Sequence, residues 1–285
     1  MNKTITLLIL LVIIIASSNE LNAQTRNVTV PKGFDVIKFY KNKGVEIEYK
    51  NDKYGIEIDQ NLRLKDDDCK YFGVIGKLSY FILWGKGNFL TNKCLSYLCG
   101  SQTTDIGSVD IQGANITDEG LKAFENTTKI ENLTLTNMKI TGEGLKYFIK
   151  NKGLKDLYLN KSKITDENLK YLENFPKLEE LNLIRTPVNG TGFSNLGTLS
   201  RLKIVRLIGT NVNDEGVKAL SVLKAPGYAL NLSYTKITDK ALLYLEKNTN
   251  IDVIFVGGTK VTEKGMENFR NKNTNTGVLI GNEEG

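Results

Sequence analysis

Apolar and polar residues alternate in short segments that recur every 24 or 25 residues along most of the chain. One unit runs from Ile130 to Phe148, and the next restates it from Leu154 to Leu172. The central apolar position of successive units is held by Val109, Leu133, Leu157, Leu181, Val205, Leu230, Ile254 and Val278. A fixed period of this length predicts a solenoid, in which each unit buries its apolar edge by stacking on its neighbours.

Each unit predicts one short strand and one short helix. Leu133 and Leu135 alternate with polar neighbours, which is the pattern of a strand with one buried face, and such strands are expected to stack in parallel. After the strand come a Thr or Asn, acidic residues and an apolar pair, as in Thr117-Asp118-Glu119 before Leu121. A side-chain N-cap followed by acidic residues in the first turn favours a short helix.

Two further positions recur in the units. One follows the strand and holds Ser162, Thr186, Thr210, Thr235 and Thr259, whose hydroxyls are expected to bond the backbone of their own turn or of a neighbouring unit. The other lies early in the helix and holds Gly120, Gly144, Gly192, Gly216 and Gly265. Glycine lowers helix propensity there, so close packing or a distorted helical turn is the expected reason.

The combined pattern, L-x-x-L-x-L-x-x-T-x-I-T-D-x-G-L-x-x-L, resembles the leucine-rich repeat of exported bacterial proteins and of the ribonuclease-inhibitor-like and F-box-associated types. The resemblance covers about residues 105–285. It implies an α/β fold, a right-handed leucine-rich-repeat solenoid or horseshoe with a concave parallel β-sheet and short convex helices, and it implies partner binding. The matching residues form the core and caps of the unit, so they specify the fold and not the partner.

The chain divides into four predicted segments. Residues 1–23 are expected to be a signal peptide, because Lys3 precedes an apolar run from Ile5 to Ala16 that is too short to span a membrane, and Ala23 is a suitable cleavage site. Residues 24–53 are an N-terminal cap, 54–104 two degenerate repeats, and 105–285 regular 24-residue repeats ending in a minimal C-terminal strand cap. Cleavage near Ala23 predicts an exported protein (secreted, periplasmic or cell-surface) with no membrane span in the mature chain.

Three cysteines and the absence of histidine limit the chemistry. Cys69 and Cys94 hold nearly equivalent places in consecutive repeats, so a disulfide between them is one hypothesis, and separate buried thiols are the other. Without His, Ser-His and Cys-His nucleophile activation and His-ligated zinc are excluded. Asp66-Asp67-Asp68 coincides with a helix start, which favours capping over calcium binding. The prediction is a protein that is not an enzyme and binds no cofactor or metal.

Partner contacts are predicted on the outward side of the strands, where the residues vary from unit to unit. The aromatic, aliphatic and Arg side chains of this predicted contact set are Trp84, Tyr158, Ile184, Arg185, Arg206, Ile208, Tyr234 and Phe255. The alternative is that Trp84 packs under the N-terminal region and that the scattered apolar residues reflect strand propensity. The net charge of +6 is spread over many Lys with interleaved acids, a pattern that disfavours nucleic-acid binding.

The predicted function is that of an exported, non-enzymatic protein that binds a macromolecular partner, in first place a protein ligand, through the concave face. Two alternatives stay open: a substrate-recruiting subunit of the F-box/ubiquitin-ligase type, and a glycan-binding surface protein. The F-box alternative lacks a recognisable F-box segment before the repeats and conflicts with the signal peptide. A carboxylate-only enzyme such as a glycosidase is a further class, but no carboxylate pair stands apart from the repeat rhythm.

Overall fold

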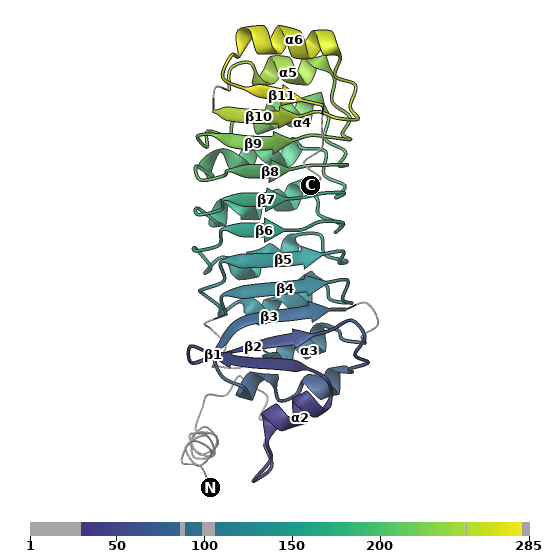
Figure 1. The fold of residues 1–285 in the computed structure, drawn as a ribbon, viewed down its shortest axis with the longest axis vertical. Coiled ribbons are helices and arrows are strands. Elements are labelled where there is room, and N and C mark those ends of the chain that lie inside the picture. Colours follow the sequence, from purple (N-terminus) through teal and green to yellow (C-terminus); the bar gives the residue numbers. More distant parts are fainter. Residues whose placement is uncertain (1–29, 86–88, 99–105, 249, 281–285) are drawn as a thin grey trace.

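The strands of the chain form one open sheet that runs the length of an elongated stack (Figure 1). The computed structural model describes residues 30–85, 89–98, 106–248 and 250–280. The predicted signal peptide and Cys99 lie outside these residues. Eleven strands of the described part follow one another in chain order from β1 to β11, and the helices that follow the strands lie behind them on the other side of the stack. The predicted α/β solenoid is therefore confirmed.

The register of the strands follows the period of the sequence. The strand bounds are β1 Glu46–Lys50, β2 Lys53–Ile58, β3 Leu78–Trp84, β4 Ser108–Gln112, β5 Asn132–Thr136, β6 Asp156–Tyr158, β7 Glu180–Asn182, β8 Ile204–Arg206, β9 Tyr228–Asn231, β10 Ile251–Phe255 and β11 Gly277–Leu279. β1 and β2 form an antiparallel hairpin, and the later neighbours pair in parallel. Val109 pairs with Leu133 and Leu133 with Leu157, and the buried row continues to Val278 as predicted.

A short helical segment follows the strand in each regular unit, as the sequence predicts. The α-helices are α2 Val36–Asn42, α3 Asn92–Leu98, α4 Asp214–Leu220, α5 Asp239–Leu245 and α6 Glu263–Lys272. The 3₁₀-helices are η1 Asp66–Cys69, η2 Phe72–Val74, η3 Asp118–Phe124, η4 Glu143–Phe148, η5 Asp166–Asn174 and η6 Thr191–Thr198. The units in the middle of the stack therefore use the tighter 3₁₀ turn, and the C-terminal units use the α-helix.

Aspartates at the helix starts bind the next unit of the stack. Asp118 accepts hydrogen bonds from the backbone N–H groups of Thr141, Gly142 and Gly144 at 2.8, 3.1 and 2.8 Å. Asp66, Asp166, Asp214 and Asp239 accept bonds from the following unit in the same way. Each carboxylate satisfies backbone donors that would otherwise lack a partner at a helix start, so this ladder ties consecutive units together.

Side-chain N-caps form in only some of the helices for which they are predicted. Asn213, Thr238 and Thr262 accept bonds from their own helices, as expected. The prediction is wrong for Thr117 and Thr165, whose side chains accept no capping bond. At Thr117 the hydroxyl instead accepts a bond from the Asn92 amide of the preceding unit, at 2.9 Å.

The recurring glycines and hydroxyls have structural roles. A Cβ added at Gly192 or Gly216 would overlap a backbone carbonyl oxygen of the preceding unit, so the expected close packing is confirmed. Thr186, Thr210 and Thr235 donate to the carbonyl oxygen three residues earlier, at 2.6–2.7 Å. Ser162 instead donates to Leu135 of the preceding unit, at 2.9 Å.

The N-terminal end of the stack contains a disulfide. Cys69 in η1 and Cys94 in α3 are bonded across consecutive units, with their Cα atoms 5.3 Å apart. Both side chains are fully buried. The disulfide hypothesis is therefore confirmed over the alternative of separate buried thiols.

Candidate functional site

The side of the sheet β1 to β11 that is turned away from the helices that follow the strands is here called the sheet face (Figure 1). Its middle row consists of Glu57, Ile82, Asp110, Thr134, Tyr158, Asn182, Arg206, Asn231, Phe255 and Leu279. No helix of the described ranges covers it. Because each position is supplied by a rigid strand, side chains far apart in the sequence keep a fixed spacing.

The structure spreads the predicted contact set over the sheet face and its edge. Trp84, Tyr158, Arg206 and Phe255 lie on β3, β6, β8 and β10, and all four are half-buried. Ile184 and Ile208 follow β7 and β8 and are also half-buried. Arg185 and Tyr234 are exposed at the turns that come next. Trp84 is separated from Tyr158 by β4 and β5, so the set is a strip and not one compact cluster.

Glu180 on β7 connects two residues of the predicted set. Its carboxylate accepts a hydrogen bond from Arg206 Nη1, in an ion pair whose side chains are 17% and 22% exposed. Tyr158 forms a hydrogen bond with the same carboxylate. Burial and this bond raise the pKa of Tyr158 to about 12, so the phenol keeps its proton and remains a donor at neutral pH. Tyr158, Glu180 and Arg206 thus form a preorganised polar group on three consecutive strands.

Small polar residues fill the sheet face between Arg206 and Phe255. Asn231 and Ser233 are 1% and 0% exposed, and the Asn231 side-chain oxygen accepts a bond from the Ser233 N–H at 3.0 Å. Larger neighbours therefore cover them. A partner approaching this part of the face would meet Arg206, Ile208 and Phe255 first.

The charge of the sheet face is unlike that of the whole chain. Its carboxylates are Glu46, Glu48, Glu57, Asp110, Asp156 and Glu180. Arg206 is the single basic side chain at the outward strand positions of the described residues, apart from Lys50 and Lys53 at the hairpin turn. The face is therefore acidic, although the chain has a net charge of +6.

Three of these carboxyl groups have raised pKa values. Burial is the largest cause for Glu57, followed by the negative charges of Glu46, Asp59, Glu48 and Asp110. Burial also raises the pKa of Asp110, which accepts a hydrogen bond from the Gln112 amide at 3.1 Å. At Asp156 the causes are burial and then the negative charges of Glu180 and Glu179.

Comparison with known proteins identifies the repeat. Residues 106–124 match the family model described as Leucine Rich repeat. The crystal structure of internalin C2 from Listeria monocytogenes matches with a TM-score of 0.50 and 22% sequence identity, covering 73% of this chain and 81% of that chain. The chain is a leucine-rich repeat protein. At this identity the likeness to internalin C2 shows the fold alone. No curated protein matches the sequence.

A row of left-handed residues marks one edge of the sheet in this leucine-rich repeat protein. It consists of Gly113, Asn137, Lys161, Arg185, Gly209, Tyr234 and Gly258, with φ between +55° and +67°. One such residue follows the strand of each regular unit. Glycine and asparagine adopt this conformation readily, but Lys, Arg and Tyr rarely do. Lys161, Arg185 and Tyr234 are exposed, so the turn holds them outward beside the sheet face.

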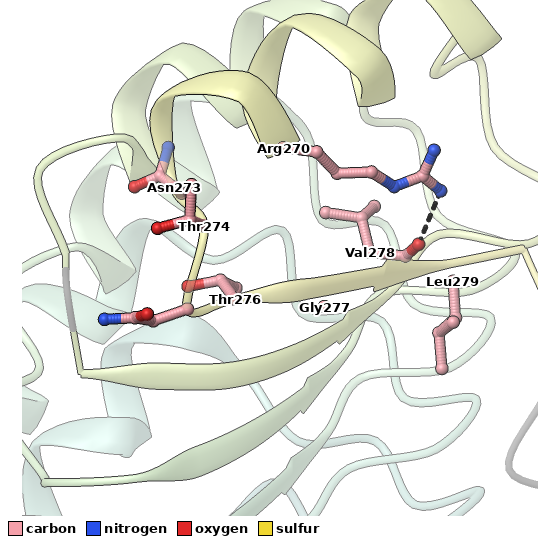
Figure 2. A pocket seen from close by; sticks show the side chains of 8 residues that line it. Arg270, Asn273, Thr274, Thr276, Gly277, Val278 and Leu279 are labelled. Atoms are coloured by element: carbon pink, nitrogen blue, oxygen red, sulfur yellow. Dashed lines mark hydrogen bonds between the residues drawn. The ribbon is translucent and has the colours of Figure 1, made fainter.

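A hollow at the C-terminal end of the repeats is a weaker candidate than the sheet face (Figure 2). It is lined by Arg270, Asn273, Thr274, Asn275, Thr276, Gly277, Val278 and Leu279. Arg270 is the one charged side chain in this lining, and its Nη2 already donates to the Val278 carbonyl oxygen at 2.7 Å. The hollow therefore brings together no group of catalytic or ligand-binding side chains.

Two searches of the described residues bear on other kinds of site. No three His, Cys, Asp or Glu side chains in these ranges are grouped so that they would hold a metal ion. No helix within them is long and apolar enough to cross a membrane.

Proposed function

We propose that this leucine-rich repeat protein is exported, is not an enzyme, and binds a protein partner through its sheet face with the predicted contact set. The observation that carries the proposal is the sheet face itself, which no described helix covers from β1 to β11. At a strand spacing of ~4.8 Å, eleven strands extend over roughly 48 Å, which is long enough for a protein interface of standard size. The leucine-rich repeat fold itself suggests a protein-binding repeat protein.

Export is supported by the Cys69–Cys94 disulfide together with the apolar run from Ile5 to Ala16. Disulfides persist in oxidising compartments and are rare in the cytosol. The same bond disfavours an F-box subunit, which would work in the cytosol. A glycan-binding face is less well supported, because Trp84, Tyr158 and Phe255 lie on separate strands and form no common stacking platform.

We expect the protein recovered outside the cytoplasm to begin at Gln24. The apolar run would direct export, and a signal peptidase accepts the small Ala23 side chain. Mass spectrometry of the N-terminal peptide, with Gln24 free or cyclised to pyroglutamate, measures this in protein from extracytoplasmic fractions of the producing cell. A full-length chain that retains Met1 and stays in the cytoplasm would contradict export.

We expect combined replacement of Tyr158, Arg206 and Phe255 by Ala to weaken partner binding by at least about 30-fold, or about 2 kcal/mol. The three changes remove two aromatic anchors and the Arg of the polar group centred on Glu180. The partner is captured with immobilised residues 24–285, purified, and titrated calorimetrically against both proteins. Circular dichroism checks that the variant remains folded.

The matched control replaces Tyr171, Arg201 and Leu243 together by Ala. Tyr171 lies in η5, Arg201 in the loop after η6 and Leu243 in α5, all outside the strands of the sheet face. It removes side chains of similar type and should leave the dissociation constant unchanged. If the control weakens binding and the sheet-face variant does not, the partner binds the helical side.

A further inference from the structure

The negative charge of the sheet face is concentrated toward its N-terminal end. Six carboxylates against Arg206, Lys50 and Lys53 give the outward strand positions a charge of −3, so the rest of the chain carries +9. Four of the six, Glu46, Glu48, Glu57 and Asp110, lie on β1, β2 and β4. Because the protein as a whole is basic, this end of the sheet is a local reversal of sign.

No described Lys or Arg side chain forms an ion pair with these four carboxylates, although Lys50 and Lys53 lie on the same face at the hairpin turn. None of the ion pairs formed between described residues includes Glu46, Glu48, Glu57 or Asp110. Glu48 accepts a bond from the Tyr80 hydroxyl at 3.0 Å, and Asp110 accepts one from the Gln112 amide, but both donors are neutral. Burial, and then the negative charges of Glu46, Asp59, Glu48 and Asp110, raise the pKa of Glu57, so an external cation would stabilise its ionised form.

Aromatic and aliphatic side chains lie among the carboxylates. Ile82 on β3 pairs with Glu57 on one side and Asp110 on the other, and Tyr80 and Trp84 flank it on the same face of the strand. Tyr and Trp rings attract Lys and Arg cations and also provide apolar contact for their methylene stems. The acidic face is defined here as Glu46, Glu48, Glu57, Tyr80, Ile82, Trp84 and Asp110.

The arrangement of the charges favours an extended polypeptide over a small cation. Within the described residues no three carboxylates are grouped closely enough to hold a metal ion. The carboxylates instead follow successive strands, so β1 to β4 present them over roughly 14 Å. An extended chain with basic side chains at intervals would contact several of them at once.

We propose that a Lys- and Arg-rich segment of the partner protein docks on the acidic face. The inference rests on the proposed function, that the sheet face binds a protein, and names the chemistry of the segment bound at its N-terminal end. The segment pairs its cations with Glu48, Glu57 and Asp110 and lays its apolar stems on Tyr80, Ile82 and Trp84.

Trp84 makes a selective test available, because it is the only tryptophan of the chain and lies within the acidic face. Its fluorescence is followed while residues 24–285 are titrated with a decalysine peptide at low ionic strength. We expect a saturable change that is suppressed by salt, and no change with a decaglutamate peptide. No change of Trp84 fluorescence with decalysine would overturn the inference.

Two triple variants that remove the same number of charges test where decalysine binds. Glu48→Gln, Glu57→Gln and Asp110→Asn together keep hydrogen-bond acceptors at all three positions and should raise the dissociation constant for decalysine by about 10-fold. Glu125→Gln, Glu173→Gln and Glu267→Gln remove the same charge from exposed positions directly after η3, in η5 and in α6, and should not change this dissociation constant. Equal effects of the two variants would show general electrostatic attraction and overturn the inference.

Failure of this inference is distinguishable from failure of the proposed function. If the captured partner loses affinity for the Tyr158, Arg206 and Phe255 variant but binds the acidic-face variant normally, the sheet face binds a protein and its N-terminal end is not the docking site. Sedimentation velocity at two protein concentrations tests the other occupant, a second copy of this chain. An oligomer that the acidic-face variant abolishes would also overturn the inference.

Discussion

Gly192→Ala is expected to lower the free energy of unfolding by about 3 kcal/mol. The added Cβ would lie 2.8 Å from the carbonyl carbon of Asp166 in the preceding unit and would overlap its oxygen. Asp166 has little freedom to move, because its carboxylate accepts bonds from the N–H groups of Gly190 and Gly192 at 2.8 and 3.2 Å. Relief of the overlap therefore requires either a shift between two stacked units or the loss of these bonds.

Gly153→Ala is the matched control, since no atom lies within 4 Å of a Cβ added there. We expect its stability to stay within about 0.5 kcal/mol of the unsubstituted protein. Urea unfolding followed by circular dichroism measures both variants. A similar loss in the two would show that the glycine effect comes from local backbone preference and not from contact between units.

The stacking of the units was predictable because one period determines every neighbour. Once Val109, Leu133 and Leu157 are placed one period apart, parallel pairing sets the outward rows of the sheet as well, and the structure has this register. The helix type was not predictable. An apolar pair three residues apart, such as Leu169 and Leu172, lies on one side of both an α-helix and a 3₁₀-helix, so the pattern does not separate them.

The candidate binding surface was less predictable from the sequence than the core. Lys161, Arg185 and Tyr234 have a left-handed backbone conformation, which their residue types do not predict. This conformation ends the outward alternation of the strand, so Arg185 and Tyr234 lie at the edge of the sheet face and not on its strands. Glu180 was missed although the period contains the information. Glu180 lies diagonally from Arg206 on the adjacent strand. This ion pair can be predicted from the sequence only by comparing opposite charges at diagonal positions of neighbouring units.

The acidic face shows how a whole-chain property hides a local one. Dispersed lysines give the chain its net charge of +6, whereas Glu57 and Asp110 face outward from strands that flank β3. Glu57 and Asp110 are 53 positions apart in the sequence, and only the parallel register of the strands brings them to either side of β3. Charge therefore has to be counted for each face of a solenoid and not for the chain.

Reduction of the Cys69–Cys94 disulfide is expected to destabilise the N-terminal units by about 3.5 kcal/mol. The bond closes a loop with a sequence separation of 25 residues, and in the chain-entropy account its loss restores that freedom to the unfolded ensemble. It joins η1 and α3 near the end of the stack, where a unit has fewer neighbours to stabilise it.

Because Trp84 lies on β3, between η1 and α3 in the chain, its fluorescence reports on these units, while circular dichroism reports on the whole stack. With dithiothreitol, the fluorescence transition should move to lower urea and precede the transition in circular dichroism, because a solenoid unfolds from its least stable units. The Cys69→Ala, Cys94→Ala variant should show the early transition with or without reductant, and Cys99→Ala should respond to dithiothreitol as the unsubstituted protein does. If the fluorescence and circular dichroism transitions coincide and dithiothreitol does not shift their urea midpoints, the disulfide contributes little and stacking alone stabilises the N-terminal units.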